Sequence, residues 1–254
     1  MRINYKTWQK YIGVLRKLNN KAAEDMIQYQ TMLAKQGISP EDGAKLIVDH
    51  AYQVATKYGE GAAAAACEMY DAIAILSKAS VPAAVPAATA TYGETAKTVY
   101  GTLKVNPEIT PSAVGRLVKM VGADTALKNA IRDGAYWAWI PSGDTCAFCL
   151  MLAGNGWQRA SRSQLEGNHA EHIHANCDCT FAISFGDVDV EGYDPEEYQQ
   201  MYDSAEGTGW RQKVNAMRRE IYDKNSEEIN AQKRDAYEKR KERESSAAEE
   251  LDVT

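Results

Sequence analysis

The first 35 residues carry apolar side chains at steps of three, four and seven positions, with polar and charged side chains between them. This spacing places the apolar side chains on one face of a helix. The apolar positions are Trp8, Ile12, Leu15, Ala22, Met26, Tyr29 and Leu33. No proline interrupts the pattern, and Gly37 follows its end, where glycine commonly terminates helices. The pattern therefore predicts one long amphipathic helix.

Two further helices are predicted before residue 81. Residues 39–42 (Ser-Pro-Glu-Asp) indicate a helix start, because serine caps, proline suits the first turn and acids favour the positive end of the helix dipole. We expect this helix to end near Tyr58, and an alanine-rich helix to follow Gly59 at residues 61–80. Residues 1–80 are thus predicted to form a helical bundle or hairpin.

Residues 81–109 are predicted to be a proline- and alanine-rich linker or a surface-hugging arm. Residues 81–91 (VPAAVPAATAT) contain two prolines and small side chains, a composition that does not sustain a helix. Helical signals return with Thr-Pro at residues 110–111 and continue through Val121. A further helix is predicted from Ala123 to about Trp139.

Helical periodicity stops after Asp144 for roughly forty residues, and residues 180–185 (TFAISF) are the best strand candidate. From Trp210 to Thr254 there is neither Gly nor Pro, and charged residues surround a thin apolar stripe. This pattern predicts a long, largely exposed helix whose end frays. The fold class is therefore mainly α (α+β): a helical bundle with long helical arms and a small Cys/His metal-knot subdomain with a short β element.

We divide the chain into an N-terminal helical region (1–80), the linker or arm (81–109), a central domain with most of the Cys and His residues (110–190) and a charged C-terminal arm (191–254). The whole chain has 29 Lys and Arg against 35 Asp and Glu, a net charge of −6. This balance argues against a general nucleic-acid coat. Residues 211–244, however, hold 11 basic and eight acidic residues, so any contact with DNA is expected there.

That charged segment has two interpretations, a solvated helix or an arm that packs on a partner chain. No apolar stretch approaches the roughly 18–20 residues of a membrane span. The first residues also lack the apolar core and cleavage site of a secretory signal. We therefore expect a chain that is made in a cytoplasm and does not enter a membrane.

Seven of the nine Cys and His residues lie between positions 146 and 179. They are Cys146, Cys149, His169, His172, His174, Cys177 and Cys179. A Cys-x-x-Cys pair lets two thiolates converge on one ion, as in structural zinc sites. We predict a structural Zn²⁺ held by Cys146, Cys149, His174 and Cys177. Cys179 is the main substitute ligand, because it shares one face of an extended chain with Cys177.

Several alternatives to a structural zinc site stay open. The cysteines could pair as disulfides or remain buried thiols, whereas a redox pair would need a thioredoxin-like βαβ setting that the sequence does not indicate. His169-Ala170-Glu171 matches the His-x-Glu of zinc deaminases, in which the glutamate transfers protons. The alternative function is therefore a metal-dependent hydrolase, a nuclease or a deaminase-like enzyme, that uses Glu171. Outside the segment, Cys67 is expected to be a small core residue and His50 a surface or core histidine.

The central segment resembles the core motif of phage Mu F-like minor head proteins. The matching residues are 139–150 (WIPSGDTCAFCL), Gly154 and 174–180 (HANCDCT), and the resemblance covers roughly residues 115–185. In that family, an aspartate and a Cys-x-x-Cys precede a loop and a segment usually written His-Pro-Asn-Cys-Arg-Cys. Here Ala175 replaces the proline and Asp178 replaces the arginine, which leaves the predicted ligands in place.

The resemblance implies a minor capsid or head-morphogenesis protein of a tailed bacteriophage, with residues 110–190 as a Mu F-like domain. Such a protein is not an enzyme and is made in the host cytoplasm. It is located in the virion, in the capsid interior or at the portal vertex. The implied partners are the portal or major capsid protein during head assembly and DNA packaging. A module delivered with phage DNA, or part of a toxin fusion, is less favoured because no toxin domain is recognisable after residue 185.

Overall fold

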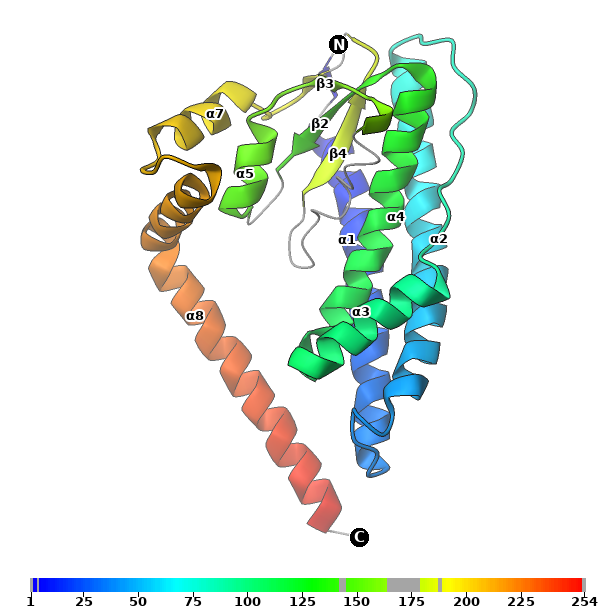
Figure 1. Cartoon of the computed structure of the whole chain (residues 1–254), viewed down its shortest axis with the longest axis vertical. Helices are drawn as coiled ribbons and strands as arrows, with labels where there is room; N and C mark the ends of the chain where they lie inside the picture. Colours follow the sequence, from blue (N-terminus) through cyan, green and yellow to red (C-terminus); the bar gives the residue numbers. More distant parts are fainter. Residues whose placement is uncertain (1, 4, 142–144, 164–178, 187–188, 253–254) are drawn as a thin grey trace. The chain divides into compact units, whose positions relative to one another are not determined.

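The computed structural model describes residues 2–3, 5–141, 145–163, 179–186 and 189–252. Within these ranges the chain is mainly helical with a small three-stranded antiparallel sheet, which confirms the predicted α+β class (Figure 1). The chain divides into two compact units, residues 1–199 and residues 200–254. No helix in the described ranges is long and apolar enough to cross a membrane.

Three long helices form most of the first unit. They are α1 (Tyr5–Lys35), α2 (Ala44–Leu76) and α4 (Thr110–Asp133), and each packs against the other two (Figure 1). The predicted first helix is confirmed. Its apolar face is buried because Ala22, Met26 and Leu33 join one hydrophobic cluster with side chains of α2 and α4.

The two helices predicted before residue 81 are a single helix, α2, so the predicted break at Gly59 is wrong. A Cβ atom at Gly59 would lie 3.1 Å from Thr89 Cγ2, and one at Gly61 would lie 3.2 Å from Leu18 Cδ2. The two glycines therefore let neighbouring segments approach α2 closely. This packing offsets the roughly 1 kcal/mol that a glycine costs inside a helix.

A helix that the sequence analysis did not predict, α3 (Tyr92–Val105), lies within the segment expected to be a linker or arm. Thr91 and Glu94 form a capping box at its start. The Thr91 backbone N–H donates to the Glu94 carboxylate at 2.8 Å, and the Glu94 N–H donates to the Thr91 hydroxyl at 3.3 Å. A short 3-10 helix, η1 (Pro107–Ile109), then connects α3 to α4.

The prediction of two helices over residues 110–121 and 123–139 is wrong at both ends of the second helix. α4 runs unbroken to Asp133, and Gly134 ends it with a φ of 66°, the left-handed conformation that glycine adopts without strain. The next residues form β2 (Tyr136–Ile140) instead of more helix. Their sequence, YWAWI, is rich in side chains that pack well on a sheet.

The sheet has the strand order β3–β2–β4, and both pairings are antiparallel. β3 is Gln158–Arg159, and β4 (Thr180–Ser184) confirms the predicted strand. The Phe181 ring on β4 lies 4.8 Å from the Trp137 ring and 4.9 Å from the Trp139 ring. These aromatic rings belong to a hydrophobic cluster that also includes side chains of α1, α2 and α4, so the sheet shares a core with the helices.

The remaining elements are short except for the last. β1 (Arg2–Ile3) pairs in parallel with β5 (Asp189–Val190). Two short helices, α5 (Ala147–Ala153) and α7 (Pro195–Ser204), follow β2 and β5. α8 (Trp210–Asp252) occupies the second unit and confirms the predicted long helix, most of whose described side chains are exposed.

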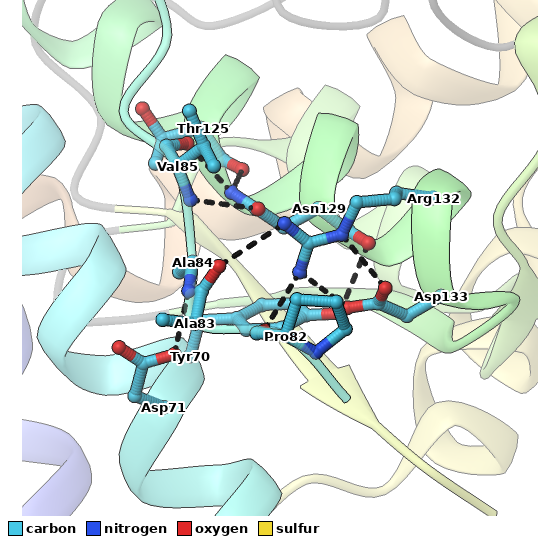
Figure 2. Close-up of polar contacts among 10 residues, drawn as sticks. All are labelled: Tyr70, Asp71, Pro82, Ala83, Ala84, Val85, Thr125, Asn129, Arg132 and Asp133. Carbon is cyan, nitrogen blue, oxygen red and sulfur yellow. Dashed lines mark hydrogen bonds and ion pairs between the residues drawn. The ribbon is translucent and has the colours of Figure 1, made fainter. Parts of the chain in front are cut away.

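Residues 81–91, called the strap below, contain no regular secondary structure and are bound by side chains of α2 and α4 (Figure 2). The Asn129 amide pairs with both backbone groups of Val85, because Nδ2 donates to the carbonyl at 2.8 Å and Oδ1 accepts from the N–H at 2.9 Å. The Thr125 hydroxyl accepts from the Ala87 N–H at 3.0 Å. These hydrogen bonds hold the strap against α2 and α4.

Arg132 binds the start of the strap and a buried carboxylate together (Figure 2). Its guanidinium donates to the carbonyls of Pro82 at 2.9 Å and Ala83 at 3.1 Å, and to the Asp133 carboxylate at 2.7 Å. The Tyr70 hydroxyl also donates to Asp133, at 2.7 Å. Arg132 holds the pKa of Asp133 below its usual value, whereas burial raises the pKa of Tyr70.

Replacing Asn129 by alanine tests whether side chains hold the strap. Asn129→Ala should lower the free energy of unfolding by about 2–3 kcal/mol, because both backbone groups of Val85 would lose their partners. The Val85 amide should then lose its protection from hydrogen exchange. Lys128→Ala, on the exposed side of the same helix, should change stability by less than about 0.5 kcal/mol. Equal effects of the two substitutions would contradict the assigned role of Asn129.

His50 is a half-buried histidine between α1 and α2. Its ring stacks on Tyr29, with centroids 3.9 Å apart and an interplanar angle of 10°. Its Nε2 atom is buried and has no hydrogen-bond partner among the described residues. Burial lowers the pKa of His50, and nearby Lys57 adds to this effect while Asp25 opposes it.

Stability should therefore fall as the pH drops through the range in which the unfolded chain protonates His50. The unfolded histidine titrates near pH 6.5 and the folded one at lower pH, so the unfolded state takes up the proton first. His50→Phe keeps a ring on Tyr29 and should remove this loss. Urea unfolding of both proteins at pH 8 and pH 5 measures it. The variant should gain stability relative to the wild type at pH 5, and parallel pH profiles would contradict the assignment.

Candidate metal centre

The register of β2 and β4 brings the residues that follow β2 and the residue that precedes β4 to the same end of the sheet. Ile140, the last residue of β2, lies opposite Thr180, the first residue of β4. The Cys-x-x-Cys pair therefore follows β2 at the same end of the sheet at which Cys179 precedes β4. A direct contact joins the halves, because the Cys179 thiol donates to the Thr145 hydroxyl with 3.8 Å between sulfur and oxygen.

The first two cysteines lie at the start of α5. Cys146 is the residue immediately before the helix, in an extended conformation, and its carbonyl accepts from the Leu150 N–H at 3.1 Å. Cys149 follows inside the helix and is fully buried, and Cys179 is only 5% exposed. Both buried cysteines belong to the hydrophobic cluster of the sheet, and Cys146 packs against that cluster.

Two contacts that the sequence did not predict hold α5 in place. The Tyr193 hydroxyl donates to the Ala153 carbonyl at 2.7 Å in a buried position, and burial raises the pKa of this tyrosine. A Cβ atom at Gly154 would lie 3.0 Å from the backbone nitrogen of Gln199, so a larger residue there would have to push α7 away from α5. No motif in the sequence identifies Tyr193, because its role depends on the tertiary structure.

Tyr11 of α1 connects the helical bundle to the start of β4. Its side chain is 6% exposed and forms a hydrogen bond with Thr180, the residue next to Cys179. Burial raises the pKa of Tyr11 well above its usual value. The first strand residue after the cysteines is therefore fixed both by the sheet and by α1.

The chemistry of the described donors suits zinc, since Cys146, Cys149 and Cys179 offer soft sulfur ligands. Within the described ranges, however, no three His, Cys, Asp or Glu side chains form a group able to hold a metal ion. His174 and Cys177, the other two predicted ligands, lie outside the described residues. The zinc site thus stays a prediction. Cys149 and Cys179 lie in one hydrophobic cluster and Cys146 packs against it, but the three thiols do not form a metal-binding group.

The residues of the alternative enzyme site, His169, Glu171 and His172, also lie outside the described residues.

Cys67 is half-buried on α2, where burial raises the pKa of its thiol. On β2, the Trp139 indole N–H is buried and has no hydrogen-bond partner among the described residues.

The sequence model of the VG15 protein family matches residues 2–205. The chain belongs to this family. The match includes α1, α2 and α4, the strap, the sheet and both halves of the Cys/His segment, and it ends before α8. No curated protein and no solved structure matches the chain.

Cys149→Ser tests the metal centre in this VG15 protein. The substitution should remove bound zinc and lower the free energy of unfolding by at least about 2 kcal/mol, because metal binding and burial of the thiol both stabilise the fold. The measurements are zinc content per chain and thermal unfolding, each with and without a chelator.

Cys67→Ser is the matched control, since it makes the same chemical change outside the segment. It should keep the zinc content and the sensitivity to the chelator, whereas Cys149→Ser should be insensitive to the chelator. If the chelator leaves the reduced wild-type protein unchanged, or if both variants respond as the wild type does, the metal centre is contradicted.

Proposed function

We propose that this chain is a minor head protein of a tailed bacteriophage and not an enzyme. In this proposal a structural Zn²⁺ joins the two halves of the Cys/His segment into a small metal knot on the helical body. Cys146, Cys149, His174 and Cys177 hold the ion, with Cys179 as the alternative ligand. The resemblance to Mu F-like head proteins supplies the function, and the arrangement around the sheet supports it.

The contact between Thr145 and Cys179 is the observation that carries the proposal. These residues are 34 positions apart, and each belongs to one half of the Mu F-like motif. Their contact is what a motif with a shared ligand set requires, because the two halves must reach one ion. The pairing of β2 with β4 in this register brings Thr145 and Cys179 close together.

The burial of the sulfur atoms favours a structural metal over a catalytic one. Cys149 is 0% and Cys179 is 5% exposed, and both lie in an apolar cluster. Catalytic zinc needs an open position for water or substrate, whereas structural zinc is closed by protein ligands. A hydrolase that uses Glu171 stays an alternative prediction, which no contact among the described residues favours.

Long helices provide the surfaces for the proposed partners, the portal or the major capsid protein. α8 exposes most of its described side chains over 43 residues, and residues 211–244 are the expected place for a contact with packaged DNA. The protein would then be located in the virion, in the capsid interior or at the portal vertex.

Protein composition of purified phage heads tests this function. The chain should be found in heads at a few copies for each portal, and should co-purify with portal or procapsids from infected cells. The measurement is quantitative mass spectrometry of gradient-purified particles. A chain that is abundant in the soluble fraction but missing from particles would show that it is not a head protein.

A further inference from the structure

Charged side chains on α8 are sorted by sign around the helix. At 100° per residue, Arg211, Arg218, Arg219 and Lys233 lie within one half of the circumference, called the basic face below. The acidic face is the opposite half, and it carries Glu220, Asp223, Glu227, Glu228, Asp235 and Glu238. Among the described side chains of α8, four bases also lie in the acidic half: Lys213, Lys224, Arg234 and Lys241. The described part of α8 therefore has two faces of opposite net charge, and its charges are not evenly mixed around the helix.

Neutral groups of the same unit contact the cations of the basic face. The Arg211 guanidinium lies 5.2 Å from the centre of the Trp210 ring, and the Lys233 ammonium lies 5.3 Å from the centre of the Tyr222 ring. Arg218 donates to the Asn215 side-chain oxygen at 3.3 Å. The basic face therefore retains its positive charge.

The acidic face has an ion pair within α8, between Glu220 and Lys224 at 2.8 Å. Both side chains of this pair are more than half exposed, so water screens it and it contributes little. Among the described side chains, six carboxylates against four bases leave this half of the helix negative. One exposed helix thus presents two surfaces of opposite charge.

We propose that α8 binds the α8 of a second copy of this chain, with the basic face of one copy against the acidic face of the next. DNA would be attracted to the basic face alone, whereas a second copy is complementary to both faces. Because the two faces lie on opposite sides, each copy can contact two neighbours through different surfaces. Such head-to-tail contacts build rings or filaments of more than two copies.

The order of charges along α8 fits parallel helices in register, the alignment of a ring whose symmetry axis runs along the helices. In that alignment Arg219 and the Glu220 of the next copy differ by one residue, about 1.5 Å of helix rise. Lys233 and Asp235 differ by two residues, about 3 Å. Each exposed pair contributes only about 0.2–1 kcal/mol, so association depends on several pairs together and weakens at high salt.

Sedimentation velocity of the full-length chain tests this inference. The wild type should form species larger than a dimer at roughly 50 mM salt and dissociate at roughly 500 mM, where screening is stronger. Replacing Arg218, Arg219 and Lys233 together by glutamate should weaken association at low salt by at least about tenfold. A wild type that stays monomeric at low salt would overturn the inference.

The matched control replaces Lys224, Arg234 and Lys241 by glutamate, which changes the net charge equally but makes the acidic face more acidic. This variant should associate at least as well as the wild type. If both triple variants lose association to the same extent, net charge and not the faces governs it, and the proposal fails.

A third variant, with Glu220, Glu227 and Glu238 replaced by lysine, provides a rescue. It should be monomeric alone but form mixed species with the basic-face variant, because their faces are again complementary. Rescue would also show that both variants are folded, and its absence would overturn the inference. If the wild type is monomeric and the basic-face variant loses only retention of a DNA duplex, the basic face binds nucleic acid instead.

Discussion

The antiparallel register of β2 and β4 is the constraint on which the rest of the central region depends. With Ile140 opposite Thr180, Trp139 is directly opposite Phe181, and both tryptophans of β2 contact that ring. A slip of one residue would put Trp137 and Trp139 on the opposite face of the sheet from Phe181 and break both ring contacts. The aromatic contacts therefore select the register, and the register places the Cys-x-x-Cys beside Cys179. The hydrogen bond between Tyr11 and Thr180 extends this order to α1.

α4 connects this region to the rest of the first unit, because it packs on α1, α2, α3 and β4. It also supplies Thr125, Asn129 and Arg132, which bind the strap. A segment with two prolines and no regular structure cannot pair its own backbone groups, so side chains must do so where it lies against the helices. The backbone groups of the strap, like those of the sheet, lie close to the core and need hydrogen-bond partners. Side chains of α2 and α4 supply those partners for the strap.

The helices and strands that the sequence predicts correctly are those whose pattern depends only on residues close together in the chain. Apolar spacing identified α1 and α8, and the TFAIS run identified β4, because periodicity follows directly from local geometry. The break at Gly59 was wrong, since the cost of that glycine is offset by packing against Thr89, which is distant in sequence. A short apolar run such as YWAWI fits either element, so the sequence predicts helix where β2 forms. The capping box of α3, Thr91-x-x-Glu94, was present in the sequence but was hidden by the neighbouring prolines.

Within the candidate site, Cys146, Cys149 and Cys179 could be selected from spacing, and the structure brings their two segments together. Thr145 and Tyr193 could not be selected, because register and tertiary packing create their roles. His174 and Cys177 stay predictions. Zinc K-edge X-ray absorption of reduced, freshly purified protein tests the metal knot most directly. The metal knot should give a shell mainly of sulfur at about 2.3 Å with nitrogen at about 2.0–2.1 Å. Protein without zinc, or a shell without sulfur, would contradict it.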